Sequence, residues 1–234
     1  MNDGRAFYAR SGSTAADLVT LFHPPYTLWH LSYVAVGAAL ADTVSFALLA
    51  WTLVVFFLGL GIAAHALDEV NGRPLGTGFS DGELWLMAAV ALAAGAVVVL
   101  VGTLTVSPWL IAWAAVGLFF SLGYPLEWPA ILHTDIGFAV AWGAYPVLTG
   151  HWVQTRSTSM SAVVVAGFAV TLSLAQRRLS TPARFVRRGT VAAEAAFDDE
   201  TWDRDRLLAT WEGPLRWLTV AVVALAAGLL IAKV

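Results

Sequence analysis

Residues 43–66 read TVSFALLAWTLVVFFLGLGIAAHA, and this stretch decides the fold class. It contains no Asp, Glu, Lys or Arg over its whole length. A helix needs about 20 predominantly apolar residues to cross the hydrocarbon core of a bilayer. The stretch therefore predicts a membrane-spanning α-helix, and further apolar runs lie before and after it in the chain.

The composition of the chain extends this prediction to the whole protein. Of its 234 residues, 59% are hydrophobic and 12% are charged. A soluble domain carries roughly a quarter charged residues, and one soluble core could not bury this much apolar surface. The composition disfavours a soluble enzyme, a nucleic-acid-binding module and a disordered regulator. The chain has no Cys, which excludes disulfides, thiolate metal sites and cysteine nucleophiles.

We predict an all-α, polytopic integral membrane bundle of about seven transmembrane helices, with six or eight as alternatives. Residues 1–234 form a single domain in this prediction. Residues 1–22 are a cytoplasmic segment that is retained, and residues 176–214, first basic and then acidic, are a charged cytoplasmic loop. The expected helices cover Tyr26–Ala41, Thr43–Ala66, Leu84–Thr103, Pro108–Gly123, Ile136–Trp152, Met160–Ala175 and Leu215–Lys233.

The positions of the basic residues predict the orientation. With a cytoplasmic N-terminus, only Arg156 and Lys233 of the 13 basic residues fall on the opposite side. Cytoplasmic loops of membrane proteins carry an excess of Lys and Arg. We therefore expect a plasma-membrane protein with a cytoplasmic N-terminus, and with membrane lipids as its surroundings.

The first group of candidate functional residues ends the second predicted helix, in AHALDEVNGRPL at residues 64–75. If the helix continues to Glu69, then His65, Asp68 and Glu69 share one face. Carboxylates and an imidazole there form a candidate divalent-cation site, in which oxygen ligands favour Mg²⁺ and the imidazole leaves room for Mn²⁺ or Zn²⁺. Asn71 and Arg73 are candidate substrate-binding residues, since Arg binds phosphate in a bidentate manner. The alternative is a helix that ends near Gly72 with ordinary loop charges beyond it.

The second group lies before and at the start of the fifth predicted helix. It consists of Tyr124 and Glu127 as candidate substrate-binding residues, and of His133 and Asp135 as candidate catalytic residues. Asp135 could also serve only as a helix cap. The predicted topology places both groups on the cytoplasmic face, which favours one shared vestibule.

A third group is the run of Arg residues from Arg177 to Arg188. An anchor to anionic lipid explains most of these residues, whereas Arg177 and Arg178, at the helix end, are expected to reach a polyphosphate. A match to G-x-S-x-G at residues 78–82 lies between two membrane helices, without the strand that a nucleophile elbow requires. The five His residues contain no H-x-x-x-H or HH pair, which disfavours a His-box desaturase and an ordinary haem-bundle cytochrome.

The order of several short motifs resembles the UbiA-type membrane prenyltransferase superfamily over about residues 22–188. Residues 23–28 (HPPYTL) are similar to the R-P-x-T-L that opens the first helix of that family. Residues 65–68 (HALD) with 73–75 (RPL) are similar to its first Asp-rich motif and the R-P-L that follows. Residues 124–126 (YPL) and 143–155 (GAYPVLTGHWVQT) are similar to its naphthoate-prenylating branch.

The sequence also departs from the family pattern. In the family, two Asp-rich motifs hold Mg²⁺ on an isoprenyl diphosphate. Here only Asp68 stands at a family Asp, His65 replaces another, and QRRLS at residues 176–180 stands where the second motif belongs. These departures disfavour binding of a diphosphate through two metals, and Arg73, Arg177 and Arg178 could neutralise part of its charge.

The resemblance implies a transferase that moves a prenyl group from an isoprenyl diphosphate to a lipophilic acceptor. His65, Asp68 and Glu69 would hold the metal, and Asp68, Glu69, His133 and Asp135 would be the catalytic groups. Two alternatives remain open at this point. One is a metal-dependent membrane enzyme of other chemistry, and the other is a non-catalytic protein that binds a lipid or a quinone.

Overall fold

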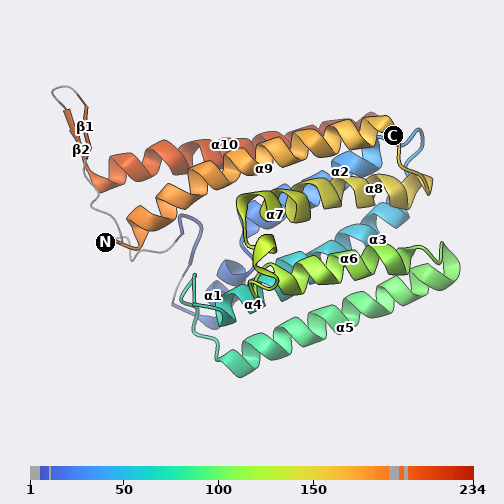
Figure 1. Cartoon of the computed structure of the whole chain (residues 1–234), viewed down its shortest axis with the longest axis horizontal. Coiled ribbons are helices and arrows are strands. Elements are labelled where there is room, and N and C mark those ends of the chain that lie inside the picture. Colours follow the sequence, from blue (N-terminus) through green and yellow to red (C-terminus); the bar gives the residue numbers. More distant parts are fainter. Residues whose placement is uncertain (1–5, 11, 190–194, 198–199) are drawn as a thin grey trace.

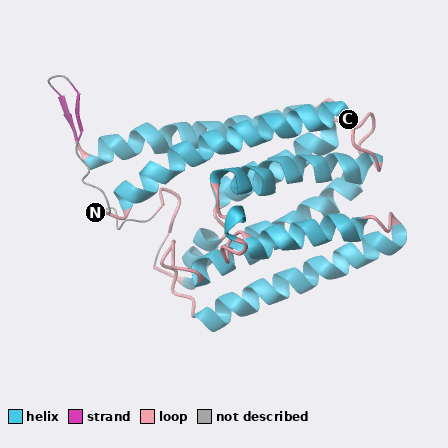
Figure 2. Cartoon of the chain, in the orientation of Figure 1, coloured by secondary structure: helices cyan, strands magenta, loops and turns pink. Residues whose placement is uncertain are grey.

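The computed structural model of the chain describes residues 6–10, 12–189, 195–197 and 200–234. The fold is all-helical, as predicted, apart from one antiparallel strand pair, β1 (Ala195–Phe197) with β2 (Glu200–Trp202). The helices pack side by side as a bundle (Figures 1 and 2). They are α1 (Thr14–Leu21), α2 (Pro24–Ala39), α3 (Phe46–Phe56), α4 (His65–Val70), α5 (Asp81–Thr105), α6 (Leu110–Gly123), α7 (Asp135–Ala139), α8 (Tyr145–Thr155), α9 (Met160–Arg187) and α10 (Arg204–Ile231).

Two of the long helices contain a π-helical segment. The π-helix η1 (Phe57–Ala64) joins α3 to α4 without a break, and η3 (Val140–Ala144) joins α7 to α8 in the same way. A short 3-10 helix, η2 (Ala130–Leu132), precedes α7. Segments of π-helix are often found at functional sites, and both of these lie beside the cavity that is described below.

Short polar side chains determine where the long helices begin. Ser45, Thr134 and Ser159 each accept a hydrogen bond from a backbone N–H in the first turn of the helix that follows. Ser80 and Glu83 form a reciprocal capping box at the start of α5. Such caps satisfy backbone donors that have no partner within the helix, so these residues fix where the preceding loops end.

The centre of the bundle is the packing of α2 against α8 and α10. Glycines allow the backbones of α2 and α8 to approach closely. A Cβ atom on Gly37 would lie 2.0 Å from the carbonyl oxygen of Val147, and one on Gly150 would lie 2.1 Å from that of Val34. Small residues serve this purpose at helix contacts inside membranes. Most of α2 is buried as a result.

The expected loop over residues 176–214 is wrong at both ends. Helix α9 continues to Arg187, past Pro182, and α10 begins at Arg204, before Pro214. Asp203 caps the start of α10, and its side chain accepts a hydrogen bond from the backbone N–H of Arg206. The two helices pack on each other along their length (Figure 1). The charged residues at the end of α9 and at the start of α10 therefore lie on helices.

Four helical stretches in the described chain are long and apolar enough to cross a membrane: Phe46–Val70, Asp81–Thr105, Met160–Arg187 and Arg204–Ile231. Large apolar side chains such as Leu104, Trp217 and Leu86 are exposed on these stretches, as lipid-facing residues are. Helix α6 is apolar but shorter. The helices are thus compatible with a membrane protein, whereas the number of crossings stays a prediction.

Candidate functional site

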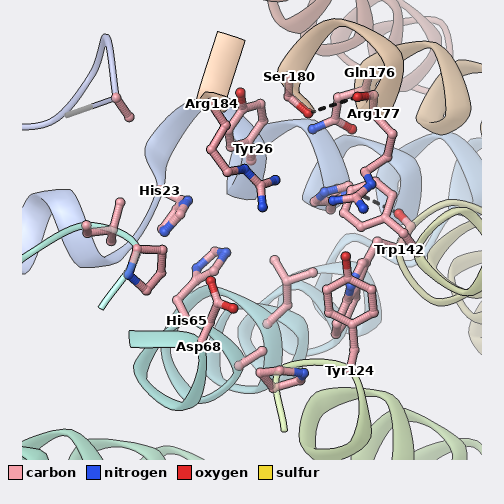
Figure 3. Close-up of a pocket in the computed structure, with 18 of the residues that line it drawn as sticks. His23, Tyr26, His65, Asp68, Tyr124, Trp142, Gln176, Arg177, Ser180 and Arg184 are labelled. Carbon is pink, nitrogen blue, oxygen red and sulfur yellow. Dashed lines mark hydrogen bonds between the residues drawn. The ribbon is translucent and has the colours of Figure 1, made fainter. Parts of the chain in front are cut away.

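A polar cavity of about 160 Å³ lies at one end of the bundle. Its walls come from the N-terminal segment, α2, the η1–α4 helix, the loop after α6, the α7–η3 helix and α9. Its charged side chains are Asp68, Arg177, Arg184, Arg187 and Arg188. Segments that are distant in the sequence therefore supply one cavity, which is strongly basic (Figure 3).

The basic wall of the polar cavity belongs to one face of α9. Arg177, Arg184 and Arg188 follow one another at spacings of about two turns and one turn, which place them on the same side of a helix. Arg177 donates from Nε to Oδ1 of Asp135 at 3.0 Å, and Arg187 pairs with the buried Glu212 of α10 at 3.4 Å. These two acids orient guanidinium groups from outside the cavity.

Arg184 differs from these two arginines. Among the described residues it has no ion pair and no hydrogen-bonded side-chain partner, although it is only partly exposed. Figure 3 shows its guanidinium group pointing into the cavity, toward the side from which His65 and Asp68 project. Asp68 in the same cavity contributes an opposite charge without direct contact, and a bound anion would supply the ion pair and hydrogen bonds that Arg184 lacks. The arrangement favours an anionic ligand.

Two histidines form the wall on the other side. The rings of His23 and His65 are stacked, with centroids 4.1 Å apart and an interplanar angle of 14°. The Tyr8 hydroxyl lies 2.7 Å from Nδ1 of His23. Burial raises the pKa of Tyr8 and lowers that of His23 well below its ordinary value. Both groups are therefore neutral, and with Tyr8 as the donor the remaining proton of His23 is on Nε2.

Two buried polar atoms of the lining have no hydrogen-bond partner in the described part of the chain. They are Nε2 of His23 and Oε1 of Gln176. Buried polar groups in folded proteins are normally hydrogen-bonded. Both atoms are thus available to a ligand, with His23 as a donor toward an anion.

Aromatic residues form a third wall beside Arg177. Tyr124 contacts Phe138 and Trp142, with ring centroids 5.7 and 5.9 Å apart. The π-helix η3 places Trp142 here, and Nδ1 of His30 donates to the Trp142 carbonyl oxygen at 2.8 Å. The carbonyl oxygen of Gly61, in the π-helix η1, accepts a hydrogen bond from Nδ1 of His65 at 3.2 Å. This leaves Nε2 of His65 as an acceptor.

An apolar groove of about 620 Å³ lies between η1, α5 and α6. Leu60 and Trp142 line both this groove and the polar cavity. A charged compartment and an apolar compartment thus meet at these two side chains. This combination fits an amphiphile with an anionic headgroup.

The structure brings some of the predicted site residues together in the polar cavity. His65, Asp68, Tyr124, His133 and Arg177 all contribute to its lining. The two sequence groups therefore do share one cavity. The remaining predicted residues have other positions and other partners.

Glu69 does not fit the expected role of a metal ligand. Its side chain is fully buried, and its carboxylate accepts hydrogen bonds from the backbone N–H groups of Leu75 and Thr77 at 2.9 and 2.8 Å. The Thr77 hydroxyl donates a third bond at 3.0 Å. Glu69 holds the loop between α4 and α5, because one carboxylate satisfies three donors there.

Arg73 and Asn71 also stabilise loops and do not line the cavity. Arg73 forms an ion pair with Asp81 and donates to the Phe79 carbonyl oxygen. The side chain of Asn71 donates to the Pro125 carbonyl oxygen at 2.9 Å and so joins the loops after α4 and α6. The expectation that these residues bind substrate is not supported by their positions.

Asp135, Glu127 and Arg178 lie outside the cavity as well. Thr134 caps α7, so Asp135 is free to pair with Arg177. Glu127 is exposed and lies 3.6 Å from Nε2 of His133. Arg178 is exposed on the side of α9 that faces away from the lining. We therefore place Asp135 as a residue that positions Arg177, and Arg178 outside the site.

The described lining offers few ligands for a divalent cation. Among the described residues, no group of three or more His, Asp and Glu side chains could hold an ion. Asp68 is the one carboxylate of the described lining. The stacked imidazoles cannot share one ion with good geometry, because a ligating nitrogen directs its lone pair in the plane of its own ring. The expected Mg²⁺, Mn²⁺ or Zn²⁺ ligand set of His65, Asp68 and Glu69 is therefore incomplete.

Sequence reasoning missed Arg184 and the N-terminal contribution of Tyr8 and His23. The signal for Arg184 was available, because Arg177, Arg184 and Arg188 match one helix face once the helix extends beyond Ala175. No signal in the sequence places His23 on His65, since that contact depends on how α2 packs beside η1. No protein-family model, curated protein or solved structure matches the chain.

Proposed function

We propose that this protein is a divergent UbiA-like membrane prenyltransferase that binds an isoprenyl diphosphate and transfers its prenyl group to a lipophilic acceptor. The observation that carries the proposal is Arg184, which forms no ion pair among the described residues, in a basic cavity that meets an apolar groove at Leu60 and Trp142. The diphosphate would occupy the cavity, and the isoprenoid chain would occupy the groove.

The charges of the cavity match such a headgroup. Four Arg side chains against one carboxylate leave a net positive lining. Arg presents several donors in a planar fork that suits phosphate oxygens. The ion pairs with Asp135 and Glu212 hold Arg177 and Arg187 in place, so the lining is organised before a ligand binds.

The proposed prenyl transfer uses the residues that line the polar cavity. The bond between the allylic carbon and the diphosphate oxygen breaks, and its electron pair leaves with the diphosphate, which Arg184 and Arg177 stabilise. The acceptor then forms a bond to the allylic cation and loses a proton to Asp68 or to Nε2 of His65. The faces of Tyr124, Phe138 and Trp142 shield the cation by cation–π interaction and by exclusion of water.

The sequence resemblance supports the proposal. Residues 23–28, 65–68 and 124–126, which carry the likeness to the UbiA superfamily, each contribute side chains to the polar cavity. The first family Asp-rich motif keeps only Asp68, and the Arg face of α9 stands where the second motif belongs. This difference marks the chain as divergent within the proposed class.

The proposed setting is the plasma membrane, with about seven crossings and a cytoplasmic N-terminus. The segments around the polar cavity contain most of the Arg residues, and the opposite connections are short. By the positive-inside rule the cavity would open on the cytoplasmic side. Through a cytoplasmic opening, the water-soluble diphosphate that the reaction releases could leave the cavity.

The test is turnover by the purified full chain in lipid nanodiscs, with radiolabelled geranylgeranyl diphosphate and a lipid extract as the source of acceptor. We expect release of diphosphate together with a labelled lipophilic product. Arg184→Gln should lower the rate by about 10- to 100-fold, the loss expected for a charged hydrogen bond. Arg178→Gln, at an exposed arginine of α9 outside the cavity, should be close to wild type.

Two outcomes would contradict the proposal in different ways. Binding of the labelled compound without diphosphate release, across several chain lengths, would identify a lipid-binding protein in place of a transferase. Absence of both binding and turnover would remove isoprenyl diphosphates as the ligand class.

A further inference from the structure

We propose that the headgroup site of this chain uses arginine side chains in place of a metal and binds a diphosphate without a divalent cation. The inference rests on the proposed function, and it specifies how the site recognises its ligand. It departs from what the resemblance implies, where Mg²⁺ bridges carboxylates and diphosphate.

The carboxylates around the cavity are committed to other partners. Glu69 is fully buried and satisfies three donors of the α4–α5 loop. Asp135 pairs with Arg177, and Glu212 pairs with Arg187. Asp68 alone faces the cavity, so a single carboxylate of the described lining remains for an ion, whereas the resemblance implies two Asp-rich motifs.

The imidazoles do not complete a cation site with Asp68. His23 and His65 are stacked at 4.1 Å, so an ion in the plane of one ring lies out of the plane of the other. Nδ1 of His133 is 3.1 Å from the Tyr124 carbonyl oxygen, and its Nε2 is 3.6 Å from Glu127. The contacts of His133 therefore direct its ring at Tyr124 and Glu127, and Nε2 of His65 is left as an acceptor beside Asp68 in the described lining.

The positive side chains supply what a cation would supply. Arg184 points into the cavity without a partner among the described residues, and Arg177 is fixed by Asp135. Nε2 of His23, which is buried and unpartnered, adds a neutral donor. Arginine can therefore neutralise and hydrogen-bond the diphosphate at the positions where a metal would act.

Asp68 separates the two mechanisms. In a metal site Asp68 attracts the ion, and its loss weakens diphosphate binding. In an arginine site Asp68 repels the anion, and its loss strengthens binding. The same substitution, Asp68→Asn, therefore has opposite effects in the two cases.

The experiment is equilibrium binding of farnesyl S-thiolodiphosphate, which ionises poorly, to the full chain in nanodiscs. It is measured with excess EDTA and with added MgCl₂, for wild type, Asp68→Asn, Arg184→Gln and Arg178→Gln. Thermal unfolding of each variant in the same nanodiscs shows whether it is folded. Arg184→Lys keeps the charge and should retain part of the affinity if the guanidinium acts on the ligand.

We expect the dissociation constant to differ by less than about threefold between EDTA and MgCl₂, which is well under the effect of one charged hydrogen bond. Asp68→Asn should bind more tightly, and Arg184→Gln about 10- to 100-fold more weakly. Arg178→Gln should bind like wild type.

Binding that disappears in EDTA, returns with MgCl₂ and is lost in Asp68→Asn would overturn the inference and leave the proposed function standing. Unchanged affinity in a folded Arg184→Gln would also overturn it. Absence of binding by wild type in both conditions would reject the proposed function itself.

Discussion

At the scale of single residues, neighbouring side chains of the same charge have different positions and different roles around the cavity. Asp68 and Glu69 are adjacent in the sequence, yet one faces the cavity and the other is fully buried against a loop. Arg177 and Arg178 differ in the same way, since one lines the cavity and the other is exposed. The sequence could name these residue types as candidates, but the choice within each pair depends on helix phase and loop packing.

Glu69→Gln should destabilise the protein. The amide has one acceptor oxygen in place of two and directs an NH₂ group at donors of the α4–α5 loop, which leaves a buried donor unsatisfied. We expect a loss of about 1–3 kcal/mol in the free energy of unfolding, measured by thermal or denaturant unfolding in detergent. Glu127→Gln, an exposed control, should change little. Equal stability of wild type and Glu69→Gln would contradict the loop-holding role.

His23 should make stability depend on pH. Burial, with neighbouring His65 and Arg184, lowers its pKa in the folded state, whereas the unfolded value is about 6.5. Below that pH the unfolded chain takes up a proton that the folded chain does not, so stability falls as the pH decreases through about 6.5. The stabilising contribution is complete above this range. We expect His23→Gln to show a shallower loss of stability between about pH 7 and 5 than wild type; an identical slope would contradict the assignment.

At the scale of elements, apolar runs and cap residues predict the positions of most helices. Charged residues at the ends of α9 and α10 lead to predicted helices that are too short. The expected ranges from Tyr26 to Trp152 overlap the observed helices. The predicted helix ends at Ala175 and Leu215 are wrong because Arg-rich turns and Pro214 favour a loop in the sequence, whereas α9 and α10 extend through them. Contacts between α9 and α10 stabilise these turns as helix, and such tertiary contacts cannot be derived from one sequence.

The contact between α2 and α8 should tolerate no side chain at Gly150. A Cβ atom there would meet the Val34 backbone at 2.1 Å, so the helices must separate. Overpacking of this kind costs typically 1–3 kcal/mol, and more where backbone atoms clash. Gly150→Ala should therefore unfold at a lower temperature in detergent. Gly167→Ala on α9, where nothing lies within 4 Å, is the control and should be neutral or slightly stabilising. Equal effects of the two substitutions would contradict the close contact.

At the scale of the whole molecule, the sequence predicts a membrane bundle and one basic face, and the structure adds the meeting of a polar cavity with an apolar groove. The apolar composition and the Arg distribution suffice for the first conclusion. The second depends on Leu60 and Trp142, which the two π-helices place at the junction. Neither residue carries a sequence signal that distinguishes it from ordinary packing.

The proposed topology can be tested at α6, which is shorter than the other candidate spans. The chain has no native Cys, so single cysteines report their own position without background. We expect Trp109→Cys, before α6, to react with a membrane-impermeant maleimide in intact cells. Trp128→Cys, after α6, should react only after permeabilisation; both tryptophans are exposed. Labelling of both from the outside would contradict a crossing by α6.

The central claim is that Arg184 in the polar cavity binds the diphosphate of an amphiphile whose chain lies in the apolar groove. The most direct measurement is the dissociation constant of farnesyl S-thiolodiphosphate for wild type, Arg184→Gln and Arg178→Gln in nanodiscs. We predict that wild type and Arg178→Gln bind alike and that Arg184→Gln binds about 10- to 100-fold more weakly. Equal affinity of all three folded proteins, or no binding by wild type, would contradict the claim.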